Sequence, residues 1–128
     1  MNPPRILVVD DNPMNLELAT FVLSAEGFEV ASAMDACGVA ARVLDFKPDL
    51  ILMDIQMPEM DGLQVSRNLK ADPATAHVII VAFTAYAMKG DEAKMRAAGC
   101  DGYLSKPIDV ATFARSVRAH LGAFADAR

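Results

Sequence analysis

The chain has 128 residues, of which 53% are hydrophobic and 23% charged, and its formal net charge is −5. These values fit one domain with a buried core, and the acidic balance argues against nucleic acid as a ligand, because phosphate neutralisation needs clustered Lys and Arg. No apolar stretch approaches the roughly 18 residues of a membrane span and no signal peptide is recognisable, so we expect a cytoplasmic protein without a membrane partner.

Short apolar runs alternate with longer amphipathic segments along the chain. This alternation is typical of repeated strand–helix units and predicts an α/β fold with a parallel sheet. The predicted strands cover residues 5–9, 29–33, 50–53, 78–83 and 102–104. The first, third and fourth are nearly unbroken aliphatic runs, as expected of central strands that helices cover on both faces.

Capping residues and glycines mark a helix after each predicted strand. The predicted helices run from an Asn12 cap and Pro13 to Gly27, from Asp35 to a point before Pro48, from Asp61-Gly62 to Asp72-Pro73, over 88–98, and from an Asp109 cap to Gly122. In the first helix one apolar face is expected from Leu18, Phe21, Val22 and Ala25. We expect one domain over residues 1–128, with flexible ends at 1–4 and 123–128.

Three carboxylates and one lysine each follow an apolar run. Asp10 and Asp11 follow the first, Asp54 follows the third, and Lys106 follows the last. Parallel strands bring their carboxyl ends to one edge of a sheet, where open α/β sheets bind ligands. Such a convergence suits a divalent cation and a phosphoryl group. Because the carboxylates repel one another without a metal, metal binding should stabilise the fold.

Four motifs, taken together, resemble the receiver domain of bacterial two-component response regulators, over essentially the whole chain. They are Val9-Asp10-Asp11-Asn12, the segment 53–62 (Met-Asp-Ile-Gln-Met-Pro-Glu-Met-Asp-Gly), Thr84-Ala85 and Tyr103-Leu104-Ser105-Lys106-Pro107. The resemblance implies a flavodoxin-like (βα)5 fold with a parallel sheet of strand order 2-1-3-4-5. It also implies that Asp54 takes a phosphoryl group from a histidine kinase or a histidine phosphotransferase and forms an acyl phosphate.

The resemblance further assigns the residues that would support this transfer. Asp11 and Asp54 would bind Mg²⁺ directly, Asp10 would act mostly through water, and the backbone carbonyl of Gln56 would complete the protein's ligands. Mn²⁺ could substitute, because both ions accept oxygen ligands. Lys106 would supply positive charge to the phosphoryl oxygens.

Other residues are implied to carry the response to phosphate. Thr84 would turn its hydroxyl to a phosphoryl oxygen, and Tyr103 would move with it as a switch. The peptide bond between Lys106 and Pro107 is expected to be cis, as in the family. The face formed by the fourth helix, the last strand and the last helix would then change its affinity for a downstream protein.

The lifetime of the phosphate is a separate hypothesis. Gln56 and Tyr86 lie two residues beyond Asp54 and Thr84, where side chains can flank the phosphoryl group. Tyr86 is bulky and would screen the acyl phosphate from water. Slow loss of phosphate is the expected consequence.

Two enzyme or carrier classes compete with this interpretation and are disfavoured. A haloacid-dehalogenase-like phosphatase also uses an aspartyl phosphate and magnesium, but it needs an acid two residues after the nucleophile, where this chain has Gln56. A flavodoxin-like carrier would not place Asp10 and Asp11 beside the flavin phosphate. We therefore expect a phospho-accepting signalling protein that assists its own phosphorylation and dephosphorylation, rather than an enzyme.

Within signalling, a free-standing single-domain regulator is favoured over a receiver domain cut from a hybrid histidine kinase or a multidomain regulator. Segments 83–92 and 98–103 resemble those of DivK-like cell-cycle regulators. We expect a monomer, or a weak homodimer that forms on phosphorylation. Cys37 and Cys100 form no CxxC pair, so neither a disulfide nor a zinc site is expected.

Overall fold

The structure is a computed structural model that describes residues 3–55, 62–84, 89–105 and 108–126. Strands and helices alternate strictly in these residues, as the sequence predicts. In chain order the elements are β1 (Arg5–Val9), α1 (Pro13–Ala25), β2 (Glu29–Ala33), α2 (Ala36–Phe46), β3 (Leu50–Asp54), α3 (Gly62–Ala71), β4 (Ile79–Thr84), α4 (Lys89–Ala97), β5 (Gly102–Ser105) and α5 (Phe113–Asp126).

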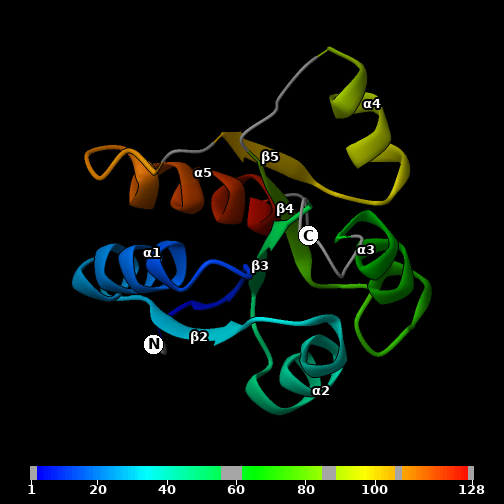
Figure 1. Ribbon diagram of the computed structural model, residues 1–128, viewed down its shortest axis with the longest axis horizontal. Helices are drawn as coiled ribbons and strands as arrows, with labels where there is room; N and C mark the ends of the chain where they lie inside the picture. Colours follow the sequence, from blue (N-terminus) through cyan, green and yellow to red (C-terminus); the bar gives the residue numbers. More distant parts are fainter. Residues whose placement is uncertain (1–2, 56–61, 85–88, 106–107, 127–128) are drawn as a thin grey trace.

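The strands form one parallel sheet in the order β2-β1-β3-β4-β5. Helices α1 and α5 cover one face, and α2, α3 and α4 cover the other (Figure 1). The predicted flavodoxin-like arrangement is confirmed. The direction in which successive strands are added changes between the adjacent strands β1 and β3, and such a switch point opens a crevice at the carboxyl ends of the strands. None of the helices in the described part of the chain is long and apolar enough to cross a membrane.

The three central strands form the middle of the core. Every residue of β3 and β4 is buried, as are the last four of β1. Alternate residues point to opposite faces, so Leu52 and Phe83 pack with α1 and α5 while Met53 packs with α2, α3 and α4. Phe83 contacts Phe113 of α5 with 5.8 Å between ring centroids. The strands are thus rigid supports for the residues at their ends.

The strand bounds differ slightly from the prediction at the carboxyl edge. β1 and β2 have the predicted bounds. β3 and β5 each continue one residue further, to Asp54 and Ser105, and β4 is shifted by one residue at both ends, to Ile79–Thr84. These extra residues pair in register, Asp54 with Phe83 and Thr84 with Ser105. Asp54 and Thr84 therefore lie within strands and not in the loops that follow.

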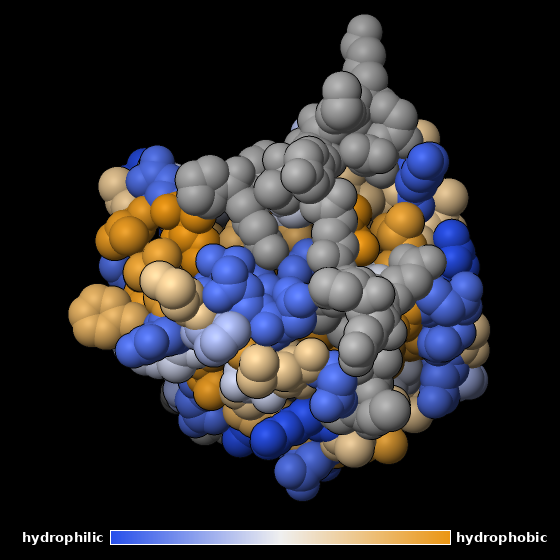
Figure 2. Space-filling model, in the orientation of Figure 1, coloured by the Kyte–Doolittle hydropathy of each residue, from blue (hydrophilic) through white to orange (hydrophobic). Residues whose placement is uncertain are grey.

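The predicted apolar face of α1 is wrong. The buried residues are Leu16, Ala19, Val22 and Leu23, so of the four predicted residues only Val22 packs in the core. The helix is apolar almost all round, and its periodicity therefore does not single out one face. Met14, Leu18 and Phe21 instead form an exposed apolar row, called here the α1 strip; Met14 is 77% and Phe21 72% exposed. Figure 2 shows hydrophobic side chains gathered on this side of the molecule.

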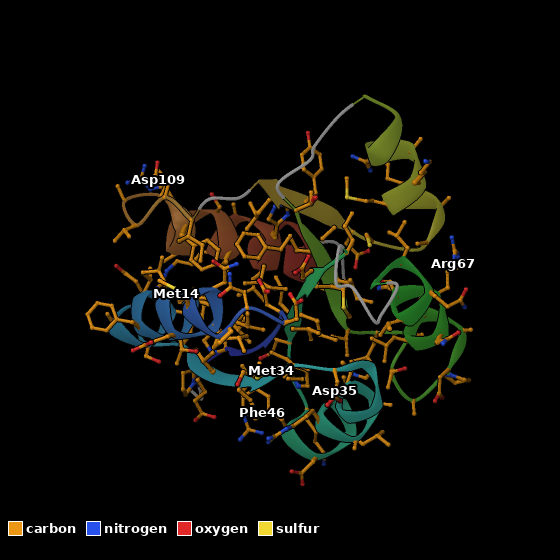
Figure 3. All side chains as sticks on the ribbon, viewed as in Figure 1. Met14, Met34, Asp35, Phe46, Arg67 and Asp109 are labelled. Atoms are coloured by element: carbon orange, nitrogen blue, oxygen red, sulfur yellow. The ribbon has the colours of Figure 1, made fainter. Side chains whose placement is uncertain are left out.

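The bounds of the last helix also differ from the prediction. Asp109 accepts a bond from the backbone N–H of Ala111 at 3.0 Å, and its carbonyl accepts bonds from Thr112 and Phe113, so a separate turn precedes α5 (Figure 3). At the other end α5 continues past Gly122 to Asp126. One glycine inside a helix costs only about 1 kcal/mol, which does not force the helix to end.

Candidate functional site

The carboxyl ends of three adjacent strands bring the predicted residues together. Asp10 directly follows β1, Asp54 ends β3, and Thr84 ends β4. β3 lies between β1 and β4, with Val9 beside Met53 and Asp54 beside Phe83. Asp54 therefore lies in the middle of this carboxyl edge of the sheet, with Asp10 and Asp11, which follow β1, on one side and Thr84 on the other.

The three aspartates form a compact group of oxygen donors. One carboxylate oxygen from each of Asp10, Asp11 and Asp54 lies within 4.8 Å of the others. Asp10 and Asp54 are buried, at 0% and 2% exposure, while Asp11 is exposed. Mg²⁺ commonly binds a few carboxylates and keeps several waters. Two buried oxygen donors and one at the surface fit that requirement.

The start of α1 holds the Asp10 carboxylate. The backbone N–H of Asn12 donates to Oδ1 at 2.9 Å, and Asn15 Nδ2 donates to Oδ2 at 3.2 Å. Asn12 also caps α1, because its side chain accepts from the N–H of Met14 at 2.9 Å, with Pro13 next. The predicted N-cap is confirmed. The same few residues thus begin the helix and orient one carboxylate of the group.

Gly62 allows α3 to begin against the end of β3. A Cβ at this position would collide with the backbone carbonyl oxygen of Asp54 and lie 2.7 Å from Ile55 Cα. Ser66 Oγ donates to the Gly62 carbonyl at 2.8 Å and fixes this first turn. Both contacts place a helix directly behind Asp54. The position requires a residue without a side chain.

Two residues beside Asp10 and Asp54 were not predicted in these roles: Asn15, and Gly62 in its contact with Asp54. Asn15 lies five residues after Asp10, in the first turn of a helix that starts at the site, and this spacing was the available signal. From the sequence, Gly62 is expected near a helix start and at the end of the 53–62 motif. Its contact with Asp54 depends on how α3 crosses β3, which no local pattern reveals.

Thr84 and Tyr103 lie on one face of the sheet. Tyr103 of β5 pairs with Ala82, and Thr84 pairs with Ser105. Paired residues of parallel strands share a face, as do residues two apart, so Thr84 and Tyr103 both face the α2, α3 and α4 layer. Thr84 is fully buried, whereas Tyr103 is 37% exposed. This placement is compatible with the predicted switch pair, whose coupling stays a prediction.

Several predicted site residues lie outside the described residues. These are Gln56, Tyr86, Lys106 and Pro107. The carbonyl ligand, the lifetime hypothesis, the lysine charge and the cis peptide therefore stay predictions.

Cys100 is not a reactive thiol that could act as a nucleophile in place of the carboxylates. Cys100 is free and buried, and its Sγ lies 3.7 Å from Ser66 Oγ. Burial raises the pKa of the Cys100 thiol, and the hydrogen bond with Ser66 opposes that rise only in part. A raised pKa keeps the thiol protonated and unreactive.

Comparisons with known proteins agree with this geometry. Residues 6–118 match the family model of the response regulator receiver domain. The chain is 40% identical over 120 residues to the polar-differentiation response regulator DivK of Brucella anthropi, covering 94% of this chain and 98% of the relative.

Solved structures show the same fold. A CheY-like response regulator receiver domain protein of Methanospirillum hungatei has a TM-score of 0.88 at 25% identity, with 98% of this chain and 99% of that chain covered. The receiver domain of a signal transduction histidine kinase of Syntrophus aciditrophicus has a TM-score of 0.79 at 29% identity, with 94% and 91% covered. The chain belongs to the response regulator receiver domain family of two-component signalling proteins.

Proposed function

We propose that this protein is a response regulator whose Asp54 accepts a phosphoryl group from a phosphohistidine in a magnesium-dependent reaction. The observation that carries the proposal is the convergence of the Asp10, Asp11 and Asp54 carboxylates within 4.8 Å at the carboxyl edge of the sheet. Family membership supports it as well. The donor is a histidine kinase or a histidine phosphotransferase.

In this reaction a carboxylate oxygen of Asp54 forms a bond to phosphorus while the phosphorus–nitrogen bond of the phosphohistidine breaks. The bonding electron pair stays on the imidazole, and the product is an aspartyl phosphate. The pairing of Asp54 within the sheet and the start of α3 directly behind its carbonyl fix its backbone, which supports its role as the acceptor in an in-line attack. Asp11 and Asp54 would hold Mg²⁺, with Asp10 beside them, and the ion would neutralise charge on the phosphoryl oxygens.

The output would pass through Thr84 and Tyr103. An aspartyl phosphate adds negative charge and hydrogen-bond acceptors next to β4. The Thr84 hydroxyl, at the end of that strand, would turn to a phosphoryl oxygen, and Tyr103 on the same face of the sheet would follow. The face of α4, β5 and α5 would then bind a downstream protein with changed affinity. Similarity to a polar-differentiation regulator supports a role in cell-cycle control.

The α1 strip is the part of the surface that suits the phosphate donor. Its apolar side chains are exposed in a row on the helix that starts at the aspartates. Because Asp10 and Asp11 directly precede this helix, a protein that presents a phosphohistidine to Asp54 comes close to its first turns. Exposed methionine and phenylalanine side chains are typical of surfaces that another protein covers.

This assignment predicts a selective defect for the double variant Met14→Ala/Phe21→Ala. Phosphate uptake from kinases that phosphorylate the wild type should slow at least about tenfold, because central apolar contacts contribute strongly to such interfaces. Uptake from a small acyl phosphate should be unchanged, and so should urea unfolding, because both side chains are exposed. Leu44→Ala, at an exposed leucine on α2, is the matched control. Equal slowing with both donors would contradict the assignment.

Intact mass measurement tests the proposed function. After incubation with acetyl phosphate and Mg²⁺, the wild type should gain one phosphate, and a chelator should prevent the gain. Asp54→Asn should gain none, whereas Asp45→Asn, which removes an exposed carboxylate on α2, should behave as the wild type. A folded wild type that takes phosphate neither from acetyl phosphate nor from phosphorylated kinases would overturn the proposal.

A further inference from the structure

Asn15 contacts the aspartate group from the first turn of α1. Its Nδ2 donates to Asp10 Oδ2 at 3.2 Å, while the backbone N–H of Asn12 donates to Oδ1 at 2.9 Å. The two oxygens of this buried carboxylate therefore each accept a bond from the start of one helix. Asp10 is fully buried, so bulk water does not set its orientation.

Two donors on different oxygens restrict rotation of a carboxylate about its terminal bond. The two donors, Asn12 N–H on Oδ1 and Asn15 Nδ2 on Oδ2, together fix the plane of the carboxylate and the directions in which its oxygens face the neighbouring aspartates. Hydrogen bonds to an ionised acceptor are stronger than those between neutral groups. We propose that Asn15 is a positioning residue that fixes the Asp10 carboxylate for Mg²⁺ and thereby sets the affinity of the site. This proposal rests on the magnesium-dependent function proposed above.

The chemistry of the asparagine side chain suits this role. An aspartate at position 15 would add a fourth carboxylate to a group in which three already lie within 4.8 Å. A lysine would bring a cation that competes with the metal. Asparagine donates a hydrogen bond without changing the charge. It is also a weaker helix former than alanine, so helix stability alone does not explain its presence in α1.

The proposal predicts weaker metal binding in a variant that stays folded. In the full chain, Asn15→Ala should bind Mg²⁺ about tenfold more weakly by calorimetric titration, because loss of a residue that orients a metal ligand commonly costs at least that factor. Urea unfolding in chelator should show only the limited loss of stability expected from one deleted hydrogen bond, and the variant should stay fully folded under the conditions of the titration. The half-saturating Mg²⁺ concentration for phosphate uptake from acetyl phosphate should rise by the same factor, while the rate at saturating Mg²⁺ should stay unchanged.

Asn68→Ala is the matched control, because Asn68 is an exposed asparagine on α3 that bonds with Gln64. It should bind Mg²⁺ as the wild type does. Wild-type affinity in Asn15→Ala would overturn the positioning role. So would partial unfolding of Asn15→Ala under the conditions of the titration, to an extent that accounts for the weaker binding. If the wild type itself bound no Mg²⁺, the proposed function would fail first, and this result is distinguishable from a failure of Asn15 alone.

Discussion

Gly62→Ala should destabilise the fold by about 2–3 kcal/mol, in the range of overpacked cores, and should slow phosphate uptake at Asp54 at least about tenfold, as small displacements of reacting groups do. The new Cβ would meet the carbonyl oxygen of Asp54 and the Cα of Ile55. Neither backbone atom can retreat without disturbing the pairing of Asp54 with Phe83. The variant therefore moves the acceptor as well as weakening the fold.

Urea unfolding and the rate of uptake from acetyl phosphate measure the two effects of this change. Gly102→Ala is the matched control, because its Cβ would clash with the His120 ring, at the opposite end of β5 from the site. It should lose stability but keep the rate of phosphate uptake. If Gly62→Ala retained the uptake rate of this control, the contact between α3 and Asp54 would have no part in placing the acceptor.

Asp54→Asn should make the chelated protein more stable than the wild type, by about 1–2 kcal/mol. Two like charges near 4.8 Å repel by roughly 1 kcal/mol in water and by several-fold more in a partly buried site, and Asp54 shares its group with two other carboxylates. Mg²⁺ at ten times its dissociation constant should then stabilise the wild type by about 1.4 kcal/mol. It should stabilise the variant far less.

Urea unfolding in chelator and in Mg²⁺ measures both parts of this prediction. Asp45→Asn changes the net charge equally but lies exposed on α2, so it should unfold as the wild type does under both conditions. A chelated Asp54→Asn protein less stable than the wild type would contradict repulsion within the group. A full response of that variant to Mg²⁺ would exclude Asp54 as a ligand.

Most of the fold could be predicted because its signals are local. Aliphatic runs of strand length, N-caps such as Asn12, and the glycines after α1 and α4 are read directly from the chain. Gly27 and Gly99 do adopt left-handed φ values of 94° and 93°. Gly122, by contrast, lies inside α5. The residue type alone does not distinguish a glycine that ends a helix from one within it. The buried face of α1 was predicted wrongly because apolar residues recur at helical spacing on more than one side of this helix.

The candidate site could be predicted in part for a geometric reason. Parallel strands bring their carboxyl ends to one edge of the sheet. Asp10 and Asp54 therefore converge although they lie 44 positions apart in the sequence. Asn15 and Gly62 act through contacts between elements. The direction of the Asn15 side chain depends on where α1 starts, and the need for glycine at position 62 depends on how closely α3 approaches β3.

Locating the phosphate by borohydride trapping tests the central claim most directly. The wild type is phosphorylated with acetyl phosphate and Mg²⁺ and then treated with borohydride, which reduces an acyl phosphate of aspartate to homoserine. Peptide mass mapping then identifies the changed residue. The account predicts homoserine at position 54 and none at positions 10 and 11. Homoserine at another position in a protein that had gained one phosphate would contradict it.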